Sequence, residues 1–290
     1  MTALLNELIV PFSYQYMAKA MWVSALVGGV CAFLSAYLML KGWSLMGDAL
    51  AHSIVPGVAG AYIIGLPFAV GAFFAGILAA IGMAFVKHHS RLREDAVIGL
   101  VFTSLFALGL LMASIWPTSV SIQTIVLGNI LAISDEDVVQ VAIIAFVSLA
   151  ILVIVWKDLM VTFFDEHHAR AVGLNPTLLK GLFFALLSAC TVAALQTVGA
   201  CLVIAMVVTP GATAYLLTDR FGRLLLISVA LGVGTSFVGA YISYFLDGAT
   251  GGVIVTLQTL LFLGAFVFAP KHGMLAARRR RLAPAGAQAS

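Results

Sequence analysis

The side chains best suited to chemistry in this apolar sequence are Asp48 and His52, within the stretch GDALAHSIVPG at 47–57. A spacing of four residues places both on one face of a helix. Ionisable groups within a membrane span are costly and usually face a water-filled path. A carboxylate with an imidazole suits Mn²⁺, Fe²⁺ or Zn²⁺.

Two interpretations of this pair are almost equally compatible with the spacing. Asp48 and His52 could form a transient metal site, or a buried hydrogen-bonded pair that links helices. The sequence holds no other acid–imidazole pair within an apolar run, which favours the metal path.

Two Pro-Gly steps lie in apolar segments, one at Pro56–Gly57 and one in the stretch VVTPGATA at 207–214. Proline in a membrane helix frees backbone groups, and a nearby hydroxyl such as that of Thr209 can satisfy them. We expect Pro56 and Gly57 to kink or break their helix and to free carbonyl groups that line a cavity on the path. At Thr209 and Pro210 we expect close helix packing, with path lining as the alternative.

A polar stretch, FFDEHHARAVGL at 163–174, separates two apolar segments. Glu166, Ala169, Arg170 and Gly173 follow a helical spacing, and Gly173 is a typical helix stop. Adjacent histidines point in different directions on a helix, so His167 and His168 are not expected to share a metal. The stretch therefore predicts a short amphipathic loop helix, either solvated or docked to a partner.

Composition identifies the solvent of these segments as lipid. Of 290 residues, 62% are hydrophobic and 9% charged, whereas soluble domains carry about 25% charged residues. A span needs roughly 20 apolar residues. Nine segments meet this length with soft edges, which predicts an all-α transmembrane bundle of eight or nine spans: 18–40, 46–65, 67–87, 96–115, 138–156, 177–197, 199–217, 223–246 and 252–269.

The rest of the sequence limits the domain organisation and the classes of function. One membrane domain is expected over 1–272, followed by a basic tail at 273–290 whose arginines suit the cytoplasm better than nucleic acid. The three cysteines lie in apolar runs without C-x-x-C spacing, which excludes a disulfide framework. The sequence has no G-x-x-x-x-G-K-[ST] phosphate loop, so ATP would have to be bound by another subunit.

Catalytic and proton-coupled functions fit poorly. An H-E-x-x-H motif is absent, and only one acid–base pair lies within a span, whereas an intramembrane enzyme needs a clustered set. A proton-coupled carrier usually places more acids inside its spans.

The motifs taken together are similar to those of a known family. The stretches at 47–57, 91–99 (RLREDAVIG), 127–133 (LGNILAI), 163–174 and 196–214, with the ending VTLQTLLFLGAFVFAPKHG, occur in order. They resemble the permeases of bacterial metal-ion ABC importers, the partners of cluster A-I binding proteins, and most of all the manganese/iron (chelated-iron) type. The resemblance covers about residues 12 to 275.

This resemblance implies a large-type importer permease in the bacterial inner membrane, with no permanently bound cofactor. Its expected partners are separate ATP-binding subunits, a second permease (a copy or a paralogue), a periplasmic metal-binding protein and the lipid bilayer. Asp48 and His52 match the acid and histidine thought to contact Mn²⁺ or Fe²⁺ in transit, and a zinc importer is the alternative. The stretch containing Asp165, Glu166, Ala169, Arg170 and Gly173 matches the coupling helix that docks into the ATPase.

The distribution of Lys and Arg generates a topological prediction. The basic loops alternate with loops that lack both residues, which places the N-terminus outside, 116–137 outside, and 87–95, 157–176, 218–223 and 270–290 in the cytoplasm. A cysteine placed at Arg170 should react with an impermeant reagent only after the inner membrane is opened. Labelling of that position in intact cells would overturn the orientation.

Overall fold

The computed structural model describes residues 10–116, 134–270 and 273–276, and these residues form helices and turns without strands. The predicted all-α class is confirmed for this part of the chain. The helices are α2 (Gln15–Lys41), α3 (Ser44–Ser53), α4 (Val55–Ile64), α5 (Phe68–His89), α6 (Glu94–Ile115), α8 (Asp135–Phe164), α9 (Glu166–Ala171), α10 (Pro176–Val198), α11 (Ala200–Leu217), α12 (Phe221–Leu246) and α13 (Thr250–Phe268).

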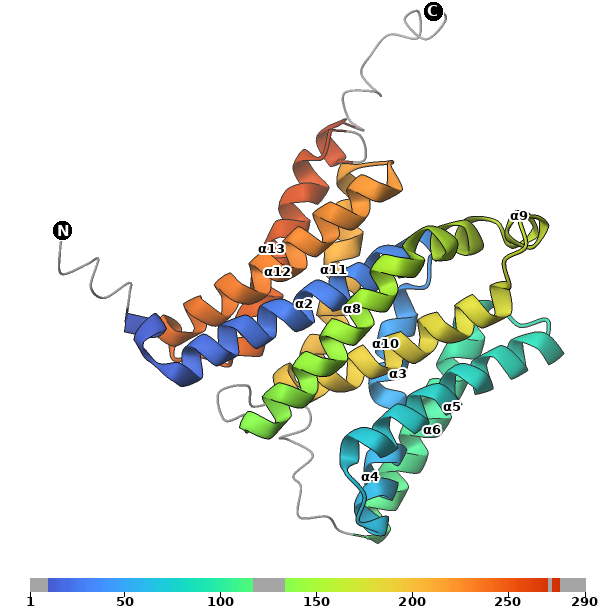
Figure 1. Ribbon diagram of the computed structural model, residues 1–290, viewed down its shortest axis with the longest axis horizontal. Coiled ribbons are helices and arrows are strands. Elements are labelled where there is room, and N and C mark those ends of the chain that lie inside the picture. Colours follow the sequence, from blue (N-terminus) through green and yellow to red (C-terminus); the bar gives the residue numbers. More distant parts are fainter. Residues whose placement is uncertain (1–9, 117–133, 271–272, 277–290) are drawn as a thin grey trace, which may run out of the picture.

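Helix α2 is the central element of the bundle. It runs between α12 on one side and α8 and α10 on the other, while α4, α5 and α6 gather at one end of the molecule (Figure 1). In the most apolar 18-residue stretch of α2, 83% of the residues are buried inside the chain, compared with 11% in the same kind of stretch of α13. Small residues permit this burial, because backbones can approach closely only where side chains are small.

The contact of α2 with α12 is the tightest example. A Cβ placed on Gly28 would lie 2.7 Å from the carbonyl oxygen of Gly232, and a Cβ on Gly232 would lie 2.4 Å from the carbonyl oxygen of Gly28. Ser228 Oγ donates a hydrogen bond of 2.6 Å to the carbonyl oxygen of Ala32 across the same pair of helices. Both glycines are therefore required by the spacing of the two backbones.

The predicted segment 46–65 is not one helix but two, α3 and α4, which meet at Ile54. The expected break near Pro56 is present, but it lies just before the proline, which occupies the first turn of α4. Proline is tolerated there because its missing N–H would have no intrahelical partner. Gly57 then serves packing: a Cβ on it would lie 2.1 Å from the carbonyl oxygen of Gly71 on α5.

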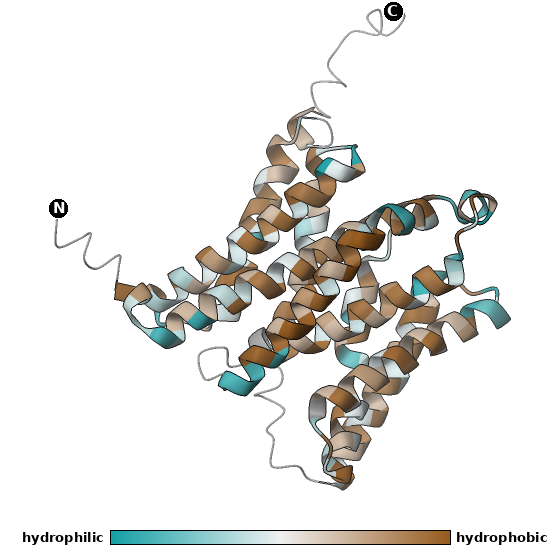
Figure 2. Ribbon diagram, viewed as in Figure 1, coloured by the Kyte–Doolittle hydropathy of each residue, from teal (hydrophilic) through white to brown (hydrophobic). Residues whose placement is uncertain are grey.

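Seven of the described helices are long and apolar enough to cross a membrane, and α3, α4 and α11 are shorter. The predicted count of eight or nine spans stays a prediction. The stretches 117–133 and 277–290, with the motif at 127–133 and most of the expected basic tail, lie outside the described residues. Hydrophobic residues cover the helix shafts and hydrophilic ones gather at helix ends, as expected for helices in lipid (Figure 2).

The glycine contact between α2 and α12 generates a stability prediction. Gly232→Ala should lower the melting temperature of the detergent-solubilised protein, because overpacking a close contact costs about 1–3 kcal/mol. The matched control is Gly234→Ala on the same helix, where an added Cβ meets nothing within 4 Å. Equal melting temperatures for the two variants would contradict this account of the packing.

Candidate functional site

Asp48 and His52 lie on consecutive turns of α3 and contact each other. His52 Nδ1 lies 3.1 Å from Asp48 Oδ1 and 3.1 Å from the Asp48 carbonyl oxygen. The side chains of His52 and Asp48 are 28% and 38% exposed. The pair is therefore partly open in the single chain, and both of its residues lie on one helix.

Helix α6 covers one side of the imidazole. The rings of Phe102 and Phe106 each meet the His52 ring edge-on, and the centroid of each phenylalanine ring lies 5.4 Å from the centroid of the imidazole. Val207 of α11 packs against Gly47 of α3. A Cβ added to Gly47 would lie 2.8 Å from Val207 Cγ1. These neighbours fix the position of α3 without supplying further polar ligands to the pair.

The pair by itself is an incomplete metal site. Among the described residues there is no group of three or more His, Cys, Asp or Glu side chains that could hold an ion. Protein sites for Zn²⁺ are almost always four-coordinate, and Mn²⁺ prefers six oxygen-rich ligands. Asp48 and His52 could thus hold a divalent ion only together with water or with groups from another chain, and such a site would be weak.

The other candidate path residues lie apart in the sequence and in the fold. Pro56 is buried in the first turn of α4. Thr209 and Pro210 of α11 line a small cavity together with residues of α12 and α13, among them Gln258. The next residue, Gly211, packs on α2, where its N–H donates to Ser35 Oγ at 3.0 Å, so the packing expected around this step is present.

Helix α9 forms where the sequence predicted it. The Asp165 carboxylate accepts hydrogen bonds from the backbone N–H groups of His167 (2.8 Å) and His168 (3.2 Å). These bonds favour the charged form and lower the pKa of Asp165. At the other end Gly173 has φ +85° and closes the helix, with the N–H of Leu174 donating to the Ala169 carbonyl oxygen at 2.9 Å.

The five residues expected to couple to an ATPase differ in where they point. Asp165 and Gly173 cap the helix, and Ala169 is fully buried against the rest of the chain. Glu166 binds inward to Lys180 and Lys41, and the Lys180 ammonium lowers the pKa of Glu166. Arg170 presents an exposed side chain, as do its neighbours His167 and His168, and the capping residue Asp165 is exposed as well.

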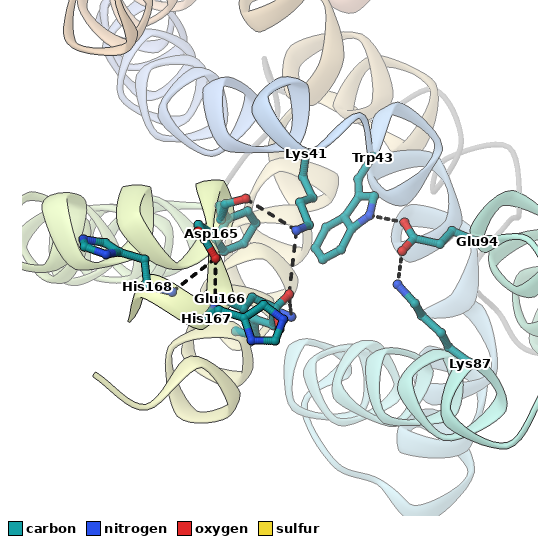
Figure 3. A network of polar contacts seen from close by, with 10 residues as sticks. Lys41, Trp43, Lys87, Glu94, Asp165, Glu166, His167 and His168 are labelled. Carbon is teal, nitrogen blue, oxygen red and sulfur yellow. Dashed lines mark hydrogen bonds and ion pairs between the residues drawn. The ribbon is translucent and has the colours of Figure 1, made fainter. Parts of the chain in front are cut away.

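A second set of contacts next to α9 was missed by sequence reasoning. Lys41 and Trp43 flank the turn between α2 and α3, and Trp43 Nε1 donates a hydrogen bond of 2.6 Å to Glu94 Oε2 (Figure 3). Glu94 also pairs with Lys87. Nothing in the spacing of the sequence shows that residues near 41, 87, 94 and 166 converge.

The chain is similar in sequence to one family of transport proteins and to individual membrane proteins with assigned names. Residues 13–269 match the model of the ABC 3 transport family. The chain is 70% identical over 277 residues to the chelated iron transport system membrane protein YfeC of Yersinia pestis, covering 96% of this chain and 94% of the relative. It is 47% identical over 274 residues to the manganese transport system membrane protein MntB of Synechocystis sp., covering 94% and 90%.

A solved structure has the same fold. PsaBC from Streptococcus pneumoniae, solved in complex with a Fab, superposes with a TM-score of 0.84 at 34% identity, covering 94% of this chain and 99% of that one. The sequence match, the helical bundle and this superposition agree over nearly the whole length. The chain therefore belongs to the ABC 3 transport family, as a membrane-spanning transport subunit of an ABC system.

Proposed function

We propose that this chain is the permease of an ATP-driven importer that moves Mn²⁺, Fe²⁺ or both across the bacterial inner membrane. The observation that carries the proposal is the Asp48–His52 pair, a carboxylate and an imidazole 3.1 Å apart and partly open on a helix of an apolar bundle. The relatives named for chelated iron and for manganese transport support these ions over zinc.

In this proposal, a periplasmic binding protein releases the ion to the pair on α3. The Asp48 carboxylate offsets part of the cost of removing water from the cation, and neutral His52 supplies a nitrogen ligand. A second permease, a copy or a paralogue, would complete the coordination with an equivalent pair. Either chain alone supplies only two ligands and would hold the ion weakly, which suits transport because the ion must leave again.

Energy would enter from outside the chain. A separate ATP-binding subunit would dock on α9 through the exposed side chains of His167, His168 and Arg170. Lys41, Lys87 and Lys180 converge near α9, and this gathering of lysines supports placing that end of the bundle in the cytoplasm. The C-terminus would then be cytoplasmic and the N-terminus periplasmic.

The metal role of Asp48 predicts that Asp48→Asn lowers the initial uptake rate of labelled Mn²⁺ and Fe²⁺ per folded molecule by about tenfold or more, because losing 1.4 kcal/mol of ion stabilisation is already a factor of ten. His52→Ala should have a similar effect. The protein should keep its melting temperature, since an asparagine preserves the shape and most hydrogen bonds. The matched control is Asp158→Asn, the same change on α8, which should transport normally.

Two outcomes of this experiment contradict the proposal. A stable Asp48→Asn protein with normal uptake would leave Asp48 as a residue of helix packing. Labelled Zn²⁺ entering faster than Mn²⁺ and Fe²⁺ in cells that depend on this system would replace the cargo with zinc.

The docking role of α9 predicts that Arg170→Glu weakens copurification with the ATP-binding subunit. The substitution reverses a charge on the outward side of the helix while the inward contacts of Glu166 and Ala169 stay in place. Arg223→Glu, at the exposed start of α12, is the control for charge reversal at the same end. Full copurification and coupled uptake by Arg170→Glu would argue against docking through this surface.

A further inference from the structure

The chain turns sharply between α2 and α3, and this turn has a fixed geometry. Gly42 has φ +74°, and the N–H of Trp43 donates to the Leu38 carbonyl oxygen at 2.8 Å while that of Gly42 donates to Met39. This pair of bonds ends α2 and sets the direction in which α3 begins. Lys41 and Trp43 on either side of the glycine consequently project toward different parts of the bundle (Figure 3).

Lys41 connects the turn to the corner where α8 meets α9. Its ammonium lies 3.7 Å from Glu166 Oε1 and donates a hydrogen bond of 3.4 Å to the carbonyl oxygen of Phe163. Glu166 is the first residue of α9, and Lys180 of α10 holds the same carboxylate. Lys41 therefore joins the end of α2 to the first residue of α9.

Trp43 connects the turn to α6. Its indole N–H donates to the carboxylate of Glu94, the first residue of that helix. The ring is buried between Phe163, whose ring it meets edge-on at 5.6 Å, and Phe184 of α10, on which it stacks at 5.6 Å. Since Trp43 is 8% exposed and packed on both sides, it cannot move without moving its neighbours.

The two helices anchored at this turn, α3 and α6, both carry residues that contact or include the His52 imidazole. Helix α3 begins at Ser44, immediately after Trp43, and carries Asp48 and His52. Helix α6 begins at Glu94 and carries Phe102 and Phe106, the two rings against His52. The backbone that holds the candidate metal ligands and the rings that orient one of them are thus anchored at one point.

We propose that the turn formed by Lys41, Gly42 and Trp43 transmits movement of α9 to the Asp48–His52 pair, with Lys41 and Trp43 as its positioning residues. This inference rests on the proposed function, because it takes α9 as the docking helix and α3 as the carrier of the ion. Lys41 receives the displacement through Glu166 and Phe163. Trp43 passes this displacement on to two helices. One is α3, which begins at the next residue, and the other is α6, whose first residue, Glu94, is bound by the Trp43 side chain.

The test uses the permease reconstituted in liposomes with its ATP-binding subunit and binding protein, and it measures Mn²⁺ ions imported per ATP hydrolysed. Lys41→Met and Trp43→Phe should each lower this ratio by at least about fivefold, the lower end of usual allosteric coupling. Copurification and melting temperature should stay close to wild type. Lys41→Arg should restore the ratio, and Lys157→Met, which removes an exposed lysine whose cation lies over Trp156, should leave it unchanged.

Combining the variants separates transmission from a local structural role. If Lys41 and Trp43 act in series, the double variant Lys41→Met/Trp43→Phe should lose no more than the more affected single variant, because residues in one connection are not additive. Losses that multiply would show independent roles and would overturn the proposal. Unchanged ratios in both single variants would overturn it as well.

A readout that needs no cargo distinguishes failure of this inference from failure of the proposed function. A fluorophore on Leu45→Cys, at the exposed start of α3, in a chain with Cys31, Cys190 and Cys201 replaced by alanine, should respond to ATP in the assembled complex. The response should disappear with Lys41→Met and persist with Lys157→Met. A response that survives Lys41→Met refutes the transmission. A wild-type complex that responds to ATP but imports neither Mn²⁺ nor Fe²⁺ refutes the proposed cargo and leaves the transmission standing.

Discussion

The constraint that the structure depends on is that backbone N–H and C=O groups in hydrocarbon must find partners within the protein. Helices satisfy this requirement by themselves, so every departure from helical geometry needs compensation. The chain departs at Gly42, where Schellman-type bonds recover two carbonyls, and at Ile54, where the N–H of Val58 still finds the Ile54 carbonyl oxygen at 3.0 Å. Helix α3 is the segment between these two points, and it carries the polar pair.

Helix α3 is short and lies between two breaks, whereas α2 before it is long. The long helices α2 and α12 are locked by the Gly28–Gly232 approach, which leaves no space for even one methyl group. Helix α3 instead lies against α6 and α11 through side chains, among them the Phe102 and Phe106 rings at His52. The fold thus combines a rigid central pair with a small element whose position is set by its neighbours.

The ion pairs of the described residues lie mainly at the ends of the bundle. Most ionic contacts in the described residues lie at one end of the bundle, where Glu166 and Glu94 are held by three lysines, and one lies at the other end, where Lys19 pairs with Asp135. Asp48 and His52 are the exception, because this ion pair lies within helix α3 and not at either end of the bundle. Partly exposed ion pairs contribute little to folding, so the pair adds little to the stability of the bundle.

The sequence by itself determined the all-α membrane class, the Asp48–His52 pair, the helix at 166–171 and its glycine stop, because these depend on composition and on spacing within one turn of helix. It could not determine that 46–65 is divided at Ile54, since proline predicts a break only to within a few residues. It also could not show that Glu166 points inward while Arg170 points outward, or that Lys41, Trp43 and Glu94 meet. Those facts depend on which helices pack together. Small residues let the helices approach closely, and this approach brings residues that are distant in sequence into contact. Such packing is a property of the folded bundle and not of any single segment.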